Sequence, residues 1–309
     1  MIELAIATFE ADLGGALELG GRALAWTEAQ GRPLLVSASL NTEALVLGAL
    51  QREDTLRSRS SARFDVQLAC RFSTGTEAQL SGAVLYHALT LPRVDTLFND
   101  ATPRTLLNRN LRAILQGYTA AGVPLRYFGT EVLALLGHPV ALVGYDQTAS
   151  GAILLEVIIG LENPCVVRSA LKRQPPAALY RLLRAAPTPQ DLLTRAVAGS
   201  VARLGATVVD ITASLPSAQT VVASPDESSP PASVAIPLGV VEAVTSPRVR
   251  ITGDLLVSTA ALAQVEALAQ AALDAGAAIS EAVLAPLRAA ALDGARPPDL
   301  LSALQNARA

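Results

Sequence analysis

The sequence predicts an α+β fold, in which a mixed β-sheet is flanked by helices and a small accessory module follows at the C-terminus. Amphipathic segments of helical length alternate irregularly with short runs of branched aliphatic residues, a pattern typical of helices and strands that share one core. A polar stretch then separates the last part of the chain from the rest. The 309 residues suffice for two domains, and a hydrophobic content of 51% suffices for a sizeable core.

The first part of the chain predicts one helix followed by four strands. Residues 16–30 carry apolar side chains that suit a helix, and Gly31 and Pro33 end it. Branched aliphatic residues then predominate in segments of strand length. The predicted strands are 34–39, 44–50, 66–72 and 83–91.

The middle of the chain predicts a helix, a strand-rich region and a second helix. Residues 105–121 have apolar side chains at helical spacing, and Gly122 follows where a left-handed cap is expected. Glycines separate the next apolar runs, as in a sheet whose strands are joined by tight turns. These runs are 125–128, 132–136, 140–145 and 151–160, and the next predicted helix is 189–204.

A change of composition marks residues 217–237. This segment contains SPDESSPPAS, which has almost no apolar content and several prolines, so we expect a linker. The chain is therefore divided into a first domain of residues 1–216 and an accessory α/β module of residues 238–309.

The accessory module is expected to begin with a small hairpin, 240–244 and 248–251. An amphipathic helix with Leu262 and Val265 on its apolar face follows. Two short helices near the C-terminus complete the module, and Pro286 interrupts the first of them.

Charge and cysteine content exclude several classes of function. The net charge of −3 provides no overall attraction to nucleic acid or to an anionic membrane, so neither is an expected partner. Two cysteines, Cys70 and Cys165, cannot build a disulfide framework, which fits a reducing compartment. The N-terminus lacks the basic start of a signal peptide, and no apolar run approaches the roughly 20 residues that span a bilayer. We therefore expect a soluble cytoplasmic protein.

Lys172 is the only lysine, and arginine supplies the other 23 of the 24 basic residues. This bias fits coding drift in a GC-rich bacterial genome, because arginine replaces lysine on most exposed surfaces. The GxxxxGK[ST], GxSxG, HExxH and CxxC motifs are all absent from the sequence. His87 and His138, the only histidines, are too few to found a metal site, and each is expected to be a structural or surface residue.

An ordered series of weaker patterns extends over nearly the whole chain. The segments are EALVLGALQ at 43–51, CRFSTGTEA at 70–78, a helix, turn and strand at 110–129, strands at 137–161, and VRITGDLL at 249–256. In their order and spacing they resemble the biotin and lipoate protein ligases. The resemblance implies a mixed sheet of the class II synthetase type and an acyl-adenylate-forming site. It also implies ATP with lipoate or octanoate as ligands, and a lipoyl domain as the candidate partner.

The resemblance also identifies candidate ligand-binding residues. In the family, a Gly-rich loop lets backbone N–H groups approach the adenylate phosphate, and an adjacent arginine binds it through two hydrogen bonds. The matching residues are Arg71, Ser73, Thr74, Gly75, Thr76, Gln51, His138 and Gly144.

Three positions depart from the family pattern. Cys70 replaces the first arginine of the Arg-Arg-x-Ser/Thr-Gly-Gly loop, and Thr74 replaces its first glycine. The lysine that the family writes in Gly-Arg-Lys-Ile falls at Pro139, which has neither a charge nor an N–H donor. Loss of a phosphate-facing cation costs several kcal/mol of transition-state stabilisation. Coding drift would leave arginine at the lysine position, so these changes indicate a degenerate adenylation site.

The leading hypothesis is a ligase-like protein with a degenerate adenylation site, acting as a binding or scaffolding subunit. The alternative is an active lipoate or octanoate ligase or acyltransferase with relocated catalytic residues, using Cys165, Lys172 or Cys70. Octanoyltransferases of this superfamily use a cysteine, although no neighbouring histidine or lysine is evident that would lower the pKa of either thiol. A third reading treats the resemblance as accidental and leaves an α+β protein of unknown role.

Overall fold

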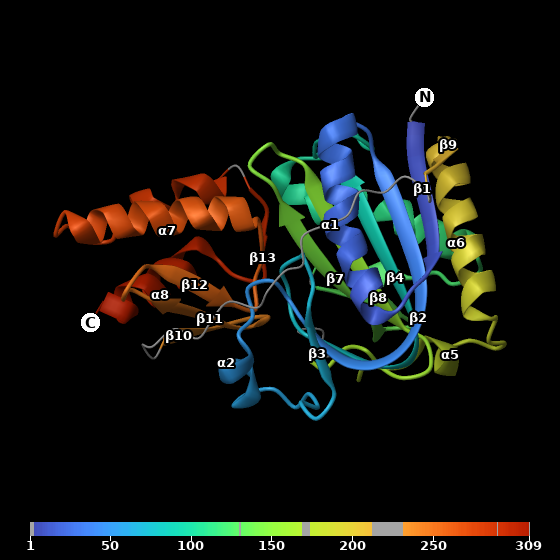
Figure 1. Ribbon diagram of the computed structural model, residues 1–309, viewed down its shortest axis with the longest axis horizontal. Coiled ribbons are helices and arrows are strands. Elements are labelled where there is room, and N and C mark those ends of the chain that lie inside the picture. Colours follow the sequence, from blue (N-terminus) through green and yellow to red (C-terminus); the bar gives the residue numbers. More distant parts are fainter. Residues whose placement is uncertain (1–2, 130, 169–173, 212–230, 289, 309) are drawn as a thin grey trace.

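The structure is a computed structural model, which describes residues 3–129, 131–168, 174–211, 231–288 and 290–308 (Figure 1). Its centre is a nine-stranded mixed sheet with the order β5-β6-β7-β8-β4-β2-β1-β9, to which β3 adds by pairing with β2. These strands are β1 (Glu3–Glu10), β2 (Leu34–Leu47), β3 (Gln67–Cys70), β4 (Ala78–Leu91), β5 (Arg126–Tyr127), β6 (Val132–Leu135), β7 (His138–Gln147), β8 (Ile153–Gly160) and β9 (Thr207–Asp210).

The sheet combines antiparallel and parallel pairs, which confirms the predicted α+β class. Strands β2 and β4 are long and antiparallel, in a register that runs from Leu34↔Thr90 to Val46↔Ala78. Strand β1 is parallel to both of its neighbours, β2 and β9. Strands β4, β8, β7 and β6 then continue the sheet in antiparallel order.

Helix α1 (Leu13–Gln30) covers one face of the sheet (Figure 1). It begins at Asp12, whose side chain accepts a hydrogen bond from the N–H of Gly15 at 2.7 Å, and it ends at Gly31 with φ of 65°. Its buried side chains form one apolar core with alternate residues of the strands, among them Val36 and Tyr86.

A second group of helices covers the opposite face. These are the 3₁₀ turn η1 (Pro103–Thr105) and helices α3 (Leu106–Asn110), α4 (Arg112–Ala120), α5 (Leu179–Leu182) and α6 (Pro189–Leu204). Helices α4 and α6 pack closely at Gly117, where a Cβ atom would collide with the carbonyl of Ala196. The short helix α2 (Glu53–Arg57) lies apart from both groups, in the connection from β2 to β3.

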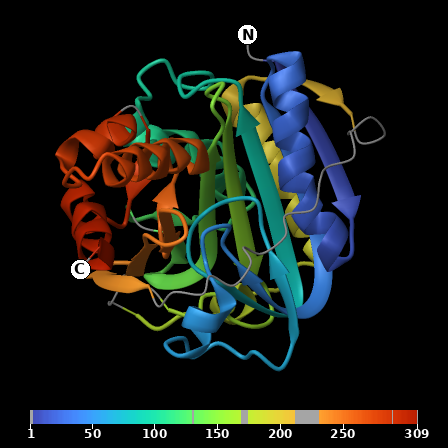
Figure 2. The same cartoon turned by 60° about the vertical axis from the view of Figure 1, so that its left-hand side comes forward.

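The C-terminal part is smaller and lies beside the β7 side of the large sheet (Figures 1 and 2). It contains a three-stranded sheet, a two-stranded ribbon, helices α7 and α8, and the 3₁₀ segment η3. These are β10 (Ala232–Ile236), β11 (Gly239–Val244), β12 (Arg250–Gly253), β13 (Leu256–Val257), α7 (Thr259–Asp274), η3 (Glu281–Arg288), β14 (Leu292–Asp293) and α8 (Pro297–Arg308). One apolar core is continuous between this part and the large sheet, and includes Tyr145, Leu155, Leu256 and Leu262.

Several element boundaries differ from those predicted. The predicted strands 34–39 and 44–50 form one strand, β2, and the predicted helix 105–121 is divided into η1, α3 and α4. Strand β10 occupies 232–236, inside the segment expected to be a linker, whereas residues 217–230 lie outside the described residues. Among the described residues, no helix combines the length and the apolar character that crossing a membrane requires.

Candidate functional site

The loop that the sequence identifies as phosphate-binding, residues 71–77, joins β3 to β4 and lies against β7. The N–H of Thr74 donates to the carbonyl of Tyr145 at 2.9 Å, which fixes the loop to this strand. The loop is buried, with both Arg71 and Thr74 at 0% exposure. A phosphate loop presents its backbone N–H groups to a ligand, whereas here the protein itself covers the loop.

Arg71, the expected phosphate ligand, is directed into the protein. Its Nη2 donates to the carbonyls of Thr74 at 3.3 Å and Thr76 at 3.0 Å. Its Nε and Nη1 have no hydrogen-bond partner in the part of the chain that the structure describes. Burial lowers the pKa of Arg71, and the nearby Glu156 carboxylate opposes that shift. The guanidinium therefore supports the loop from inside the protein.

Glu156 connects the loop to the core of the large sheet. It is the one acidic residue within the apolar strand β8, and it is completely buried. Its Oε2 accepts a hydrogen bond from the N–H of Ser73 at 2.9 Å, and its Oε1 accepts one from the hydroxyl of Tyr86. Burial, with a further contribution from this carboxylate, raises the pKa of Tyr86 well above its ordinary value. The Ser73 backbone thus binds a carboxylate of the protein.

Thr74 joins the loop to the C-terminal part. Its hydroxyl accepts a hydrogen bond from the N–H of Val257 at 3.0 Å and lies 2.7 Å from the carbonyl of Tyr145, to which it donates. Gly75, the next residue, has φ of 122° and packs so tightly that a Cβ atom would meet the guanidinium of Arg71 and the side chain of Leu256. The loop therefore has contacts with two strands, β7 and β13, on either side of the junction.

Gly144 of β7 allows this close approach. A Cβ atom at Gly144 would collide with the side chain of Ser73 and would lie 3.2 Å from Cζ of Arg71. The glycine thus makes room for residues of the loop itself. Thr76 is buried as well, and its hydroxyl has no hydrogen-bond partner among the described residues.

A network of buried carboxylates and arginines covers the other end of the loop. Glu77 accepts hydrogen bonds from Arg168, with Nε at 3.1 Å and Nη2 at 3.0 Å. Burial alone would raise the pKa of Glu77, but the hydrogen bonds from Arg168 lower it below its ordinary value. Asp254, just after β12, pairs with the same guanidinium at 2.6 Å and also with Arg59.

Gln51 lies at the centre of this network. Its Nε2 donates to Glu77 at 2.8 Å and to Asp254 at 2.6 Å, while its Oε1 accepts from the N–H of Gly48 at 2.9 Å. An amide side chain can make four hydrogen bonds, and that of Gln51 makes three. The candidate ligand-binding residue Gln51 is therefore engaged with the C-terminal part through Asp254.

The position of the expected lysine is at the start of β7. Pro139 is buried opposite Ala134 of β6, and its carbonyl accepts from the N–H of Ala177 at 2.9 Å. His138, next to it, is partly exposed and lies 3.0 Å from the carbonyl of Pro175 through Nδ1. Lys172 lies outside the described residues.

Both cysteines are free thiols in environments that disfavour a thiolate. Burial raises the pKa of Cys165 to about 12 and that of Cys70 to about 11. Cys165 is 1% exposed, and its thiol lies 3.5 Å from the carbonyls of Val140 and Ile158. A thiol nucleophile requires a lowered pKa and access to substrate, and Cys165 has neither.

The remaining candidates do not form a metal or base site. His87 is buried between Ser37 and Tyr118, with its ring nitrogens 2.8 Å and 2.7 Å from their hydroxyls. Burial lowers the pKa of His87 to about 4, so it is a neutral core histidine at physiological pH. Within the described ranges, no three His, Cys, Asp or Glu side chains are placed so that they could hold a metal ion.

A comparison of the sequence with known protein families and with curated proteins finds no match. The fold, by contrast, has similar solved structures. Plasmodium falciparum LipL1, solved in complex with lipoate, matches with a TM-score of 0.58 and 10% sequence identity, over 87% of this chain and 89% of that chain. The chain has the lipoate ligase fold.

Two further structures with the lipoate ligase fold match with lower scores. A lipoate-protein ligase A bound with ATP gives a TM-score of 0.49 at 12% identity, over 68% of this chain and 90% of that chain. A structure from an archaeal lipoylation system, described as a bi-partite lipoate protein ligase and its E2 lipoyl domain from Thermoplasma acidophilum, gives a TM-score of 0.48 at 12% identity, over 68% of this chain and 87% of that chain. The match to LipL1 shows that the resemblance read from the sequence reflects a shared fold and is not accidental.

The sequence alone did not identify the residues that hold the loop 71–77 in place. Glu156 had a visible signal, because a single acid within the apolar run 151–161 must find a buried partner. Asp254 had a weaker one, as the acid of VRITGDLL between two apolar segments. Arg168 had none, since its contacts to Glu77 and Asp254 depend on distant parts of the chain.

Proposed function

We propose that this protein is a binding or scaffolding subunit with the lipoate ligase fold, whose adenylation site no longer forms an acyl-adenylate. Its candidate partner is a lipoyl domain, and its candidate ligands are lipoate or octanoate. Its proposed setting is the cytoplasm, in keeping with two free thiols.

The observation that carries this proposal is the inward-directed, fully buried Arg71. An arginine that binds phosphate must offer its N–H fork to the ligand. Only Nη2 of Arg71 donates, to the carbonyls of Thr74 and Thr76 of its own loop, and the buried Nε and Nη1 face no ligand-accessible surface and have no partner among the described residues. The same loop is fixed to β7 through Thr74 and Tyr145, and to β13 through Thr74 and Val257.

A second argument comes from the missing cation. Acyl-adenylate formation develops negative charge on the carboxylate and α-phosphate, which a positioned cation stabilises. The family pattern expects that cation at Pro139, a residue with no charge. Arg168 is a described cation near the loop, but its guanidinium is held by Glu77 and Asp254. The chemistry therefore lacks its main electrostatic element.

The decisive experiment is isotope exchange between pyrophosphate and ATP in the presence of lipoate or octanoate. We expect no exchange above the rate without protein, and a lipoate-protein ligase of known activity assayed in parallel serves as the positive control. Exchange that depends on either acid would refute the proposal.

Partner binding is tested separately, by calorimetric titration of the protein with an unmodified lipoyl domain. Saturable binding supports the scaffolding role. Calorimetry with lipoate and octanoate then establishes whether an acyl ligand is retained. If the protein binds neither the domain nor an acid, the binding role fails even when exchange is absent.

The alternative function is an acyltransferase that uses a cysteine or Lys172. The raised pKa of each thiol weighs against Cys70 and Cys165 as nucleophiles. Incubation with octanoyl carrier protein followed by intact mass measurement tests it directly. An added octanoyl group that is lost in Cys165→Ala or Cys70→Ala would favour the transferase, whereas an unchanged mass would remove it.

A further inference from the structure

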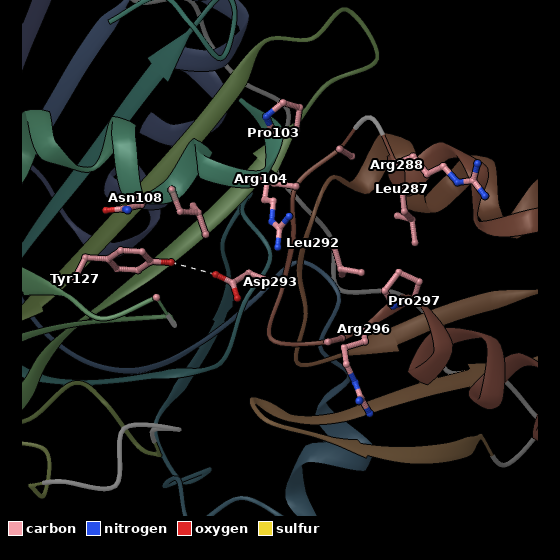
Figure 3. A pocket seen from close by; sticks show the side chains of 15 residues that line it. Pro103, Arg104, Asn108, Tyr127, Leu287, Arg288, Leu292, Asp293, Arg296 and Pro297 are labelled. Atoms are coloured by element: carbon pink, nitrogen blue, oxygen red, sulfur yellow. Dashed lines mark hydrogen bonds between the residues drawn. The ribbon is translucent and has the colours of Figure 1, made fainter. Parts of the chain in front are cut away.

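A hollow lies at the junction between the helices of the first part and the C-terminal part (Figure 3). Its volume is about 510 Å³, and no residue of the loop 71–77 lines it. One wall comes from η1, α3 and the end of β5, and the other from η3, β14 and the residues before α8. Ligand sites in proteins have this size and favour junctions between domains.

Polar groups from both parts meet in this hollow. The hydroxyl of Tyr127 donates to Oδ2 of Asp293 at 3.1 Å, across the junction. The guanidinium of Arg104 reaches from η1 into the space beside Asp293 (Figure 3). Arg104 is an exposed residue, and its guanidinium has no hydrogen-bond or ion-pair partner among the described residues. Burial raises the pKa of Asp293 above its ordinary value.

Apolar side chains form the rest of the lining. Leu107 stands on the side of α3, and Leu287, Leu292 and Pro297 stand on the opposite side. The hollow therefore combines an aliphatic body with a polar end, where a cation and a carboxyl group converge. Three arginines but only one acid line it, and one of these arginines, Arg296, is already paired with Asp299.

We propose that this hollow is a binding site for a small amphipathic anion, with a carboxylate or phosphate held by Arg104 and an aliphatic body against the leucines. A planar guanidinium binds either oxyanion through two hydrogen bonds. Asp293 and Tyr127 form the polar wall beside that anion and are the groups that meet a hydroxyl or amide of the ligand. A ligand held in this way contacts both parts of the chain and strengthens their association.

The test is titration of the whole protein with hexanoate, hexyl phosphate and uncharged hexanamide, followed by ligand-observed NMR. We expect at least one anion to bind saturably, with hexanamide weaker by at least about tenfold, since a charge-assisted hydrogen bond contributes on the order of 1.5–3 kcal/mol. The preferred anion distinguishes a carboxylate site from a phosphate site.

Arg104→Gln should lower the affinity of the protein for the anion by at least about tenfold. Arg112→Gln, on the exposed side of α4 and outside the lining, is the matched control and should bind as the wild type does. Absence of saturable binding by both anions overturns the proposal, as does equal binding by Arg104→Gln or equal loss in Arg112→Gln. Binding that survives in Arg104→Gln would place the anion elsewhere, and would leave the proposed binding function of the fold untouched.

Discussion

The Thr74 hydroxyl accepts a hydrogen bond from the backbone N–H of Val257 at 3.0 Å, across a sequence separation of 183 residues. In the ligase pattern a glycine is expected at this position. The side chain that replaces it joins the candidate phosphate loop to strand β13 of the C-terminal part. The residue that departs from the family pattern thus makes an internal contact between the two parts of the chain.

Replacing Thr74 tests this contact. Thr74→Val keeps the shape but removes the hydroxyl, so the N–H of Val257 and the carbonyl of Tyr145 each lose a partner. We expect the free energy of unfolding to fall by about 1–3 kcal/mol, the usual cost of a buried unsatisfied group. Thr74→Ser retains the hydroxyl and should lose much less. Urea unfolding measures both, and equal stability of Thr74→Val and the wild type would contradict the assignment.

Asp254 should be more important for stability than an exposed acid. Asp254→Ala leaves Arg59 and Arg168 facing each other without their shared carboxylate, and we expect a loss on the order of 3 kcal/mol. Asp65→Ala, which breaks the exposed pair with Arg63, is the control and should leave the unfolding midpoint unchanged. Similar effects of the two substitutions would show that the network does not stabilise the junction.

Asp146 predicts a specific pH dependence. Burial raises its pKa from 3.8 to about 6, despite hydrogen bonds from the N–H and hydroxyl of Thr259. The folded state therefore binds the proton more tightly, and this residue's contribution to stability falls as pH rises from 3.8 to about 6, by at most about 3 kcal/mol.

Asp146→Asn removes that titration and keeps an acceptor for Thr259. We expect the difference in unfolding free energy, variant minus wild type, to become more positive as pH rises through this window. Other groups titrate in both proteins and cancel in the difference. A difference that stays constant between acidic and neutral pH would show that the Asp146 carboxyl group keeps its ordinary pKa.

Leu136 is an unfavourable residue for its turn. It has φ of 53°, precedes Gly137 in the two-residue connection from β6 to β7, and is 75% exposed. Asparagine is preferred at this position of such a turn. Leu136→Asn should raise the free energy of unfolding by about 1 kcal/mol. Leu136→Ser adds a polar side chain that has no preference for a positive φ. A comparable gain in the free energy of unfolding from serine would show that polarity, and not the turn conformation, causes the effect.

The thiols should react slowly in the folded protein. With pKa values of about 11 for Cys70 and about 12 for Cys165, little thiolate exists at neutral pH. We expect iodoacetamide to label the native protein about a hundredfold more slowly than the urea-unfolded protein. Intact mass measurement on Cys70→Ala and Cys165→Ala identifies each site. Equal labelling rates in folded and unfolded protein would indicate an accessible, reactive cysteine.

The elements with local signals were predicted well. Helix α6 has the predicted bounds 189–204, because Pro189 suits a first helical turn and Gly205 adopts the left-handed cap. The polar residues of β2 misled the prediction, since Asn41 and Glu43 keep their backbone pairing with β4. Strand β1 was missed because its parallel neighbours, β2 and β9, lie at distant positions in the chain.

The candidate site could be predicted only in part. The resemblance identified the loop and the fold to which it belongs. It did not predict the state of the loop, which depends on the contacts of Glu156 with Ser73 and of Thr74 with Val257. Such contacts form only when whole elements pack against one another. A sequence pattern indicates which residues are buried, but it gives little indication of the partners that they contact.

The apolar core is continuous between the large sheet and the C-terminal part, which makes each part dependent on the other. Leu256 and Leu262 pack in the same cluster as Tyr145 and Leu155. Each part therefore buries a surface of apolar side chains against the other part. A gene shortened at its 3′ end would yield a fragment that exposes this surface and aggregates. The two parts are therefore expected to fold and to be inherited as one unit.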